Sequence, residues 1–167
     1  MAFAAAASMT SPCTIREATP HDTTAILACL HEAFTPFRSA YTPAAFADTV
    51  LTPETLHRRF ASMTILVATA PEGAVIGTIA ADVQRTEGHL RGMAVRAANQ
   101  GHGVAAQLLA AAESLLRSRG CRRVTLDTTE PLSRAIAFYR KNGYVPTGLV
   151  QDFYGMALHE FAKELVV

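Results

Sequence analysis

The chain has 167 residues, of which 50% are hydrophobic and 17% are charged, and its formal net charge at pH 7 is +1. This length fits one domain with a substantial core, and the near-neutral charge gives no electrostatic basis for binding nucleic acid or a membrane surface. The three cysteines, Cys13, Cys29 and Cys121, are scattered and form no C-x-x-C pair. We therefore expect a globular cytoplasmic protein with no disulfide framework, no metal site and no membrane partner.

The N-terminal segment MAFAAAASMTSP is apolar and rich in alanine, but it lacks the basic start of a secretory signal. We expect residues 1–12 to be a disordered tail. No internal repeat, low-complexity tract or linker divides the remainder, so residues 13–167 are predicted to form a single domain.

The N-terminal part of that domain is predicted to be mainly helical. In chain order, the expected elements are a strand at 13–17, a helix at 20–34, a loop at 35–43, a short helix at 44–50 and a helix from about Pro53. The helix at 20–34 carries its apolar side chains at helical spacing, on Ile26, Leu27, Leu30 and Phe34. Proline suits the first turn of the helix that begins near Pro53.

Strands dominate the rest of the domain. The expected elements are strands at 64–70, 74–84 and 89–95, a helix from 104 to 119, a strand at 123–127, a helix at 133–142, and closing strands at 144–150 and 153–159. The Pro71-Glu72-Gly73 turn makes the first two of these strands an antiparallel hairpin. Strands that lead into helices in the C-terminal half require a mixed, partly parallel sheet covered by helices, an α/β (α+β) fold.

The connection between the strand at 89–95 and the helix after it carries two glycines, Gly101 and Gly103. Glycine lacks a Cβ atom, so a ligand can approach its backbone closely. The first N–H groups of a helix have no partner within the helix, and the helix dipole adds partial positive charge there. This connection is therefore a candidate site for a phosphate or diphosphate.

Two motifs carry a resemblance to a known family. Gln100-Gly101-His102-Gly103-Val104-Ala105 resembles the Q/R-x-x-G-x-G/A signature of the GCN5-related N-acetyltransferase (GNAT) superfamily, and Met93-Ala94-Val95 resembles that family's splayed strand. Further on, AIAFYRKNGY at 135–144 resembles its second motif, A-x-x-[LF]-Y-x-x-x-G-[FY]. The resemblance is densest over 89–145. It implies a mixed sheet of six to seven strands flanked by about four helices, with a splayed central strand.

The resemblance also implies a reaction. Acetyl-CoA would be the co-substrate, and its acetyl group would pass to a primary amine of a small-molecule or peptide acceptor by direct attack in a ternary complex. The backbone N–H groups from Gln100 to Ala105 would bind the diphosphate. The edge of Met93–Val95 would pair with the pantetheine arm, and an N–H there could hold the developing oxyanion. Arg96, His102 and Arg140 are candidate phosphate contacts.

Proton transfer needs an acid and a base. The resemblance makes Tyr139 the proton donor to the departing sulfur. A typical alkylamine has a pKa of ~10, so the acceptor must lose a proton to some base. Relatives often use a glutamate near the position of His89, and an imidazole can serve at neutral pH. His89 is our candidate base, with Glu87 or a chain of water molecules left open.

Other features of the site are less defined. The family commonly has asparagine where this chain has Leu132, so Thr129 or Ser133 would have to replace its hydrogen bond to pantetheine. The acceptor pocket should come from residues 34–60 and the last strands, where the aromatic residues are Phe34, Phe37, Tyr41, Phe46 and Tyr154. Nothing in these residues specifies the amine.

Two other functions compete with this one. A non-catalytic acyl-CoA-binding module would keep the same fold. An NAD(P)-dependent oxidoreductase is more remote: Gly101-x-Gly103-x-x-Ala106 also fits a dinucleotide-binding pattern, but too little chain comes after it for paired βαβ halves. Whether the protein forms a homodimer is left open.

Overall fold

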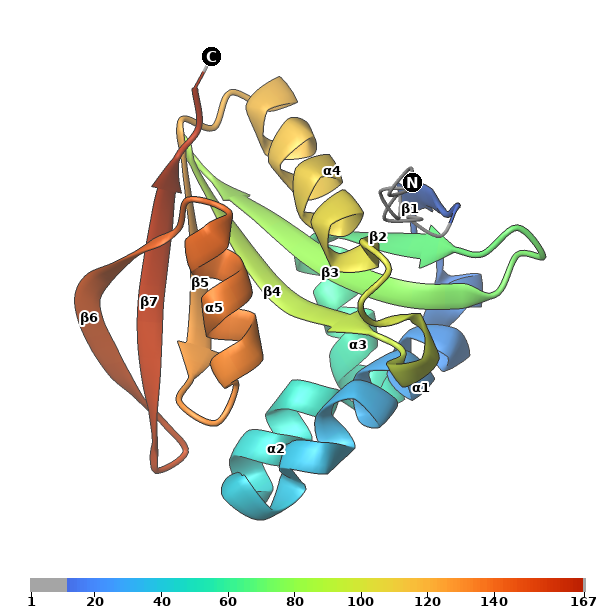
Figure 1. Cartoon of the computed structure of the whole chain (residues 1–167), viewed down its shortest axis with the longest axis horizontal. Coiled ribbons are helices and arrows are strands. Elements are labelled where there is room, and N and C mark those ends of the chain that lie inside the picture. Colours follow the sequence, from blue (N-terminus) through green and yellow to red (C-terminus); the bar gives the residue numbers. More distant parts are fainter. Residues whose placement is uncertain (1–11, 167) are drawn as a thin grey trace, which may run out of the picture.

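The computed structural model describes residues 12–166. The tail expected at 1–12 therefore lies, apart from Pro12, outside the described residues. The described strands form one mixed sheet in the order β1-β2-β3-β4-β5-β7-β6, with helices on both faces (Figure 1). The predicted mixed, partly parallel fold is confirmed.

The elements follow the predicted order. The strands are β1 (Thr14–Glu17), β2 (Thr64–Thr69), β3 (Val75–Gln84), β4 (Glu87–Val95), β5 (Arg123–Thr129), β6 (Val145–Phe153) and β7 (Met156–Glu164). The α-helices are α1 (Thr23–Phe34), α2 (Pro43–Val50), α3 (Pro53–Ser62), α4 (Val104–Ser118) and α5 (Ser133–Lys141). Short 3₁₀ turns are η1 (Pro20–Asp22), η2 (Thr35–Ala40) and η3 (Ala97–Asn99).

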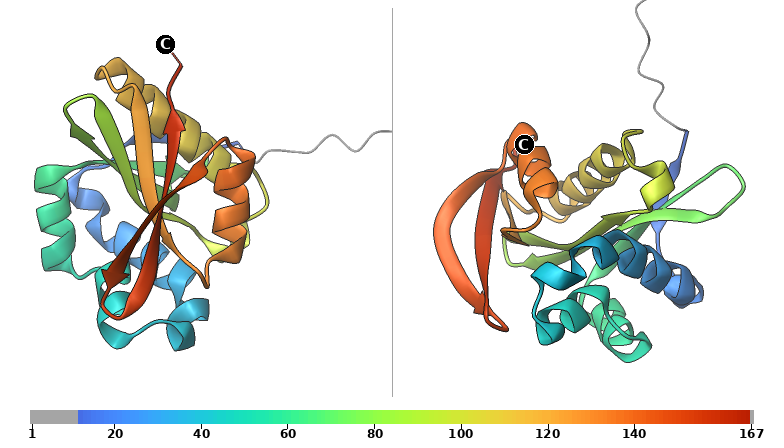
Figure 2. Two further views of the ribbon diagram at one scale, coloured as in Figure 1. Left: turned by 90° about the vertical axis from the view of Figure 1, so that its left-hand side faces the viewer. Right: turned by 60° about the horizontal axis from the view of Figure 1, so that its bottom comes forward.

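The helices form two layers. Helices α1 to α3 cover one face of the sheet, and α4 and α5 cover the other (Figure 2). Threonines precede the prolines that begin α2 and α3: the Thr42 hydroxyl accepts a hydrogen bond from Ala45 N–H and the Thr52 hydroxyl accepts one from Thr55 N–H. These caps satisfy N–H groups that the helix itself leaves free.

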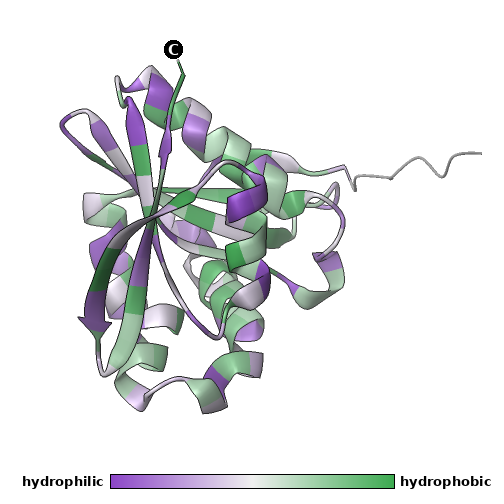
Figure 3. Cartoon of the chain, turned by 60° about the vertical axis from the view of Figure 1, so that its left-hand side comes forward, coloured by the Kyte–Doolittle hydropathy of each residue, from purple (hydrophilic) through white to green (hydrophobic). Residues whose placement is uncertain are grey.

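Each helical layer has its own core. On the α4 side, Val104, Leu108 and Leu116 pack with strand residues, while Ile26, Leu30 and Leu56 fill the α1–α3 side. Hydropathy follows the same division: hydrophobic residues line the ribbons between the layers, and hydrophilic residues alternate with them along the helices (Figure 3). Burial on both faces explains why the central strands have apolar residues at successive positions.

The centre of the sheet opens. β4 and β5 run parallel, but only Glu87–Leu90 pairs with Arg123–Leu126, and beyond that the two strands diverge (Figure 1). On its other edge β4 bulges, because Gly92 and Met93 together lie opposite Ile79 of β3. Gly92 has a φ of 60°, in the left-handed region that glycine adopts most readily. The predicted splayed central strand is thus confirmed, with the bulge as its local cause.

Two turns between neighbouring strands were predicted at the wrong positions. β4 begins at Glu87 rather than at residue 89, because the hairpin turn is only Arg85-Thr86. The closing strands, predicted at 144–150 and 153–159, are longer, and their turn is Tyr154-Gly155. Tyr154 has a φ of 50° there, and tyrosine gives little sequence signal for that conformation. Within residues 12–166, no helix has the length and apolar character needed to cross a membrane.

Candidate active site

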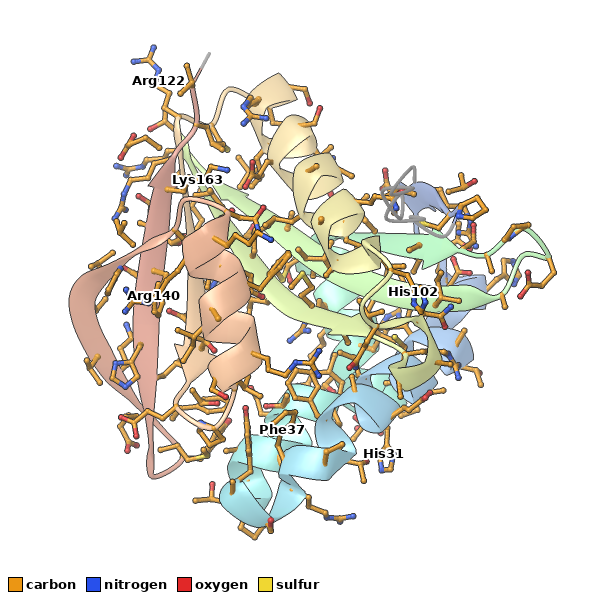
Figure 4. All side chains as sticks on the ribbon, in the orientation of Figure 1. His31, Phe37, His102, Arg122, Arg140 and Lys163 are labelled. Carbon is orange, nitrogen blue, oxygen red and sulfur yellow. The ribbon has the colours of Figure 1, made fainter. Side chains whose placement is uncertain are left out.

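A cavity of about 620 Å³ lies where β4 and β5 separate, and we call it the larger cavity. Its walls come from β4, the turn before α4, the end of β5 and helix α5. The wall includes Tyr139 and eight of the predicted cofactor-binding residues: Met93, Ala94, Val95, Gln100, Gly101, Gly103, Val104 and Ala105. His102, also predicted to bind the cofactor, does not line the cavity; its side chain is exposed on the turn before α4 (Figure 4).

The turn before α4 presents unpaired backbone N–H groups. Gly103 is the N-terminal cap of α4, with a φ of 82°. No carbonyl or side chain of the described residues accepts a hydrogen bond from the N–H groups of residues 101–106. The Gln100 side chain instead donates to the Val95 carbonyl, at 3.0 Å, and ties the turn to the end of β4. A cluster of free amides at the positive end of a helix favours an anion.

The basic residues around the turn differ from expectation. Arg96 donates to the Val75 carbonyl at 3.0 Å and pairs with Glu32 at 3.2 Å, so it anchors the β4–α4 connection rather than facing the cavity. Arg140 lies over the Phe161 ring, on the side of α5 facing β7 (Figure 4). Arg134 and Lys141 line the larger cavity instead.

Tyr139 is placed deep in the wall of the larger cavity. Its ring is 9% exposed and stands edge-on to Tyr144, with the ring centroids 5.8 Å apart. Burial raises the pKa of Tyr139 far above its ordinary value, so the phenol keeps its proton. No hydrogen bond joins its hydroxyl to the described residues. A protonated, unengaged hydroxyl facing a cavity can donate to a ligand.

A buried polar network supports that position. The Tyr144 hydroxyl donates to Glu113 Oε1 of α4 at 2.9 Å, and Lys163 of β7 pairs with the same carboxylate at 2.9 Å. These bonds therefore join α4 and β7 to the segment between α5 and β6, next to Tyr139.

His89, the predicted base, does not line the larger cavity. Its Nδ1 lies 2.8 Å from Thr125 Oγ1, and its Nε2 lies 3.3 Å from Asp127 Oδ2. Asp127 lines the cavity in front of it. Glu87, the alternative base, pairs with Arg123 at 2.6 Å near the start of β4 and does not line the cavity either.

Sequence reasoning missed Asp127 as a site residue. Its position carried a usable signal, because it lies near the carboxyl end of a parallel strand, where ligands of open α/β sheets commonly bind. Recognising it would have required knowing that β5 pairs with β4 and then leaves it.

A smaller cavity of about 100 Å³ opens on the α1–α3 side of the same region. It shares Phe34, Leu90, Arg91, Gly92, Asp127, Thr128 and Leu132 with the larger cavity. Its other lining residues are Tyr41, Asp48, Thr49, Arg59, Thr129, Phe153 and Leu158. The two cavities therefore share a wall around the β4 bulge and the end of β5.

Of the aromatic residues expected around the acceptor, some line the cavities, one lies in the core and one is exposed. Phe34 and Tyr41 line the smaller cavity, and Phe37 lines the larger one, pointing in from η2 (Figure 4). Phe46 is core, packed edge-on against Tyr41. Tyr154 is 54% exposed in its turn, and its neighbour Phe153 lines the smaller cavity instead.

The two threonine hydroxyls near Leu132 differ in their hydrogen bonding. Thr129 Oγ1 lies 2.6 Å from the Tyr41 hydroxyl, so this hydroxyl is already used within the protein. Thr128 Oγ1 is buried and has no hydrogen-bond partner among the described residues. Leu132 itself lines both cavities as the residue before α5. A buried hydroxyl without a partner is costly, and a bound ligand would satisfy it.

Other chemistries find less support. The described part of the chain contains no group of three or more His, Cys, Asp or Glu side chains placed to bind a metal ion. Within residues 12–166, β4–β5 is the one parallel strand pair. A dinucleotide-binding fold needs paired βαβ halves, so the oxidoreductase alternative lacks its architecture.

Comparison with known structures agrees on the fold. The chain superposes on the PaiA N-acetyltransferase of Thermoplasma acidophilum in complex with coenzyme A, with a TM-score of 0.76, 18% identity and coverage of 92% of this chain and 99% of that one. The chain also superposes on the ribosomal-protein-S18-alanine N-acetyltransferase of Escherichia coli, with a TM-score of 0.75, 18% identity and coverage of 93% of this chain and 96% of that one. A GCN5-related N-acetyltransferase of Rhodopseudomonas palustris superposes with a TM-score of 0.76, 23% identity and coverage of 94% of this chain and 98% of that one.

Comparison with curated protein sequences gives no match. The model of the Acetyltransferase (GNAT) family matches residues 26–144, which is more than half of the chain. That match spans both sequence motifs and most of the strands that line the larger cavity. The chain therefore belongs to the GNAT acetyltransferase family.

Proposed function

We propose that this protein is an acetyl-CoA-dependent N-acetyltransferase that acetylates a primary amine by direct attack in a ternary complex. The observation that carries the proposal is that one cavity joins the unpaired amides of residues 101–106, the unpaired edge of β4 and the Tyr139 side chain. These are an anion site, a pairing edge for an extended arm and a hydrogen-bond donor, in a single continuous space.

The turn and the strand edge fit the co-substrate. The N–H groups between Gly101 and Ala105 would bind its diphosphate, with Arg134 and Lys141 as nearby cations. The arm would lie along residues 91–95, which have no strand partner on the β5 side. A backbone N–H of Met93–Val95 would then stabilise the oxyanion that develops from the thioester carbonyl.

Asp127 and His89 would together remove the amine proton. His89 Nδ1 lies 2.8 Å from Thr125 Oγ1, which also contacts the Gly88 carbonyl at 3.4 Å. His89 Nε2 lies 3.3 Å from Asp127 Oδ2, so a proton can be shared between the imidazole and this carboxylate. The proton would pass from the amine to Asp127 and on to His89, which keeps the role predicted for it but acts behind a carboxylate.

The bond changes balance with these groups and solvent. The amine nitrogen attacks the thioester carbonyl carbon and a C–N bond forms. The C–S bond breaks and the electron pair leaves on sulfur. Tyr139 donates a hydrogen bond to that sulfur as its charge develops. The thiolate then takes up a proton from solvent, and the Asp127–His89 pair releases to solvent the proton that it took from the amine. The products are an N-acetylated amine and a free thiol.

Thr128 would take the role of the missing asparagine before α5. Thr129, one of the residues first considered for it, is bound to Tyr41. The buried Thr128 hydroxyl has no partner among the described residues, and Thr128 lines both cavities. Ser133 also lines the larger cavity and stays a candidate. A location in a reducing cytoplasm, suggested by the three free cysteines, belongs to this proposal as well.

The test is a screen of amine acceptors with acetyl-CoA that reads release of the free thiol, run beside thermal-shift measurements with CoA and with NAD(P). Turnover together with stabilisation by CoA supports the proposal. Stabilisation by CoA without turnover of any amine would favour the acyl-CoA-binding module. Stabilisation by NAD(P) alone would contradict both.

A further inference from the structure

Arg59 of α3 reaches the smaller cavity at the β4 bulge. Its guanidinium lies so close to Gly92 that a Cβ atom on residue 92 would be 2.7 Å from Arg59 Nη1. The same glycine therefore permits the bulge and leaves room for the guanidinium. Arg59 lines the smaller cavity but not the larger one.

This guanidinium forms no ion pair within the described protein. Two carboxylates line the same cavity, but Asp48 pairs with Arg91 at 3.5 Å, and Asp127 Oδ2 lies 3.3 Å from His89 Nε2. The Arg59 carbonyl accepts a hydrogen bond from Met63 N–H, but its guanidinium forms no ion pair and no hydrogen bond with residues 12–166. Burial, together with the charge of Arg91 and against that of Asp48, lowers the pKa of Arg59 to about 10.

An unpaired cation in such a place needs an explanation. The residue is half-buried, and losing even part of the water around an unpaired charge is unfavourable, so an anionic ligand that pairs with this guanidinium would be stabilised. The remaining walls are mostly apolar, with Phe34, Leu90, Phe153 and Leu158 among them. A planar guanidinium with free N–H groups matches a carboxylate or a phosphate in a two-point contact. Asp48 and Asp127 line the same cavity, and their negative charge disfavours the doubly charged phosphate relative to a carboxylate.

The carboxylate could belong to the amine acceptor or to the acyl group of the thioester. The position of Arg59 favours the acceptor. It comes from α3 on the face of the sheet opposite the turn before α4, and it lines only the smaller cavity. Asp127 lines that same cavity and attracts the ammonium form of an amine. One cavity thus offers a negative group for an amine and a positive group for an acid.

We propose that Arg59 binds a carboxylate carried by the acceptor, and that the acceptor is an amino acid or a comparably small amino carboxylate. The substrate class rests on the proposed acetyl transfer, since it names the amine that reacts. The smaller cavity, at about 100 Å³, suits an acceptor of this kind better than the continuous chain of a peptide.

The experiment compares matched acceptors. With acetyl-CoA, kcat/KM is measured for L-leucine, L-methionine, L-phenylalanine and L-glutamate, each as the free acid and as its α-carboxamide. At least one free acid should exceed its amide by about tenfold or more, the effect of a charged hydrogen-bonded pair. The amide has the less basic amine and is the better nucleophile at neutral pH, so this preference cannot come from amine reactivity.

Variants assign the preference to Arg59. Arg59→Met should reduce the acid-to-amide ratio to about one while the affinity for CoA, measured by calorimetry, is unchanged. Arg59→Lys should retain part of the ratio, because it keeps the charge but loses the planar fork. Arg58→Met, at the exposed neighbouring position on α3, is the matched control and should leave the ratio as in the wild type.

Several outcomes would overturn the proposal. Amides that react as well as acids would do so, as would an acid preference that survives Arg59→Met. If succinyl-CoA outperforms acetyl-CoA in a manner that depends on Arg59, the carboxylate belongs to the acyl group and the acceptor assignment is wrong. If no amine is acetylated at all, the proposed function fails, and calorimetric binding of the same acids to the CoA complex, compared between wild type and Arg59→Met, decides the carboxylate site separately.

Discussion

The two ends of the candidate site are built in different ways. At the α4 end, the groups that would hold the co-substrate are backbone amides of consecutive residues, from Gly101 to Ala106. At the opposite end, the smaller cavity is made of side chains from distant segments, with Asp48, Arg59, Arg91 and Asp127 supplying its charges. A site built from contiguous backbone leaves a motif in the sequence, whereas one built from dispersed side chains does not.

The largest effect should come from the backbone end. Gly103→Asp should weaken CoA binding by about 1000-fold, because a carboxylate at the start of α4 repels the diphosphate and competes for its amides. Aspartate tolerates a left-handed conformation better than most residues, so the free protein should keep its fold. Calorimetry with CoA measures the affinity. Gly103→Asn is the uncharged control, and equal affinity for both variants would contradict the electrostatic argument.

The next effect tests the base. Asp127→Asn should lower kcat/KM by about 100-fold, because its side chain lines both cavities. His89→Gln, one group further from the amine, should cost about tenfold in kcat/KM. Glu87→Gln, at the far end of β4, is the control and should leave the rate unchanged. A larger loss in His89→Gln than in Asp127→Asn would make His89 the direct base.

Tyr139→Phe should lower kcat by about tenfold without weakening CoA binding, since it removes only the hydrogen-bond donor to the sulfur. Burial raises the pKa of Tyr139, and the neutral phenol is its active form, so the wild-type rate should show no fall from its ionisation up to pH 10. Steady-state rates between pH 6 and 10 measure both. Unchanged kcat in Tyr139→Phe would remove this residue from the mechanism.

The smallest effect concerns Thr128. Thr128→Val keeps the shape but removes a hydroxyl that has no partner in the described protein, so stability should be unchanged or slightly higher. If this hydroxyl replaces the family's asparagine, the affinity for acetyl-CoA should fall by about five- to tenfold. Thr129→Val is the contrasting variant: it should lose stability, because its hydroxyl is paired with Tyr41. An unaltered affinity in Thr128→Val would leave the role to Ser133.

The sequence allowed much of the fold and the α4 end to be predicted. Periodicity located the helices, and the glycine motif and Tyr139 were assigned to what is now one cavity. The bulge at Gly92 could not be predicted, because a lone glycine in a strand does not say where its partner strand slips. Nor could the role of Arg59 be predicted, because it depends on the side chain of this α3 residue reaching Gly92 of β4.

The prediction of His89 as base shows the same limit in another form. Residue type and spacing placed an imidazole near the reacting atoms, but they could not show that Asp127 of a neighbouring strand stands between it and the cavity. The closing strands failed for a more local reason, since a turn at Tyr154-Gly155 has no strong residue signature. The sequence gives the spacing of residues along the chain. It does not tell which of two side chains on neighbouring strands lies nearer the cavity.

The four-residue ladder between β4 and β5 has a kinetic consequence. Because the strands part beyond Leu90, the larger cavity extends along β4 and the turn before α4, while the smaller one reaches toward α3, and the two share walls around the bulge and the end of β5. We expect the thioester in the larger cavity and the amine in the smaller one to bind at the same time without blocking each other. The thiol product should therefore inhibit competitively with respect to the thioester and not with respect to the amine.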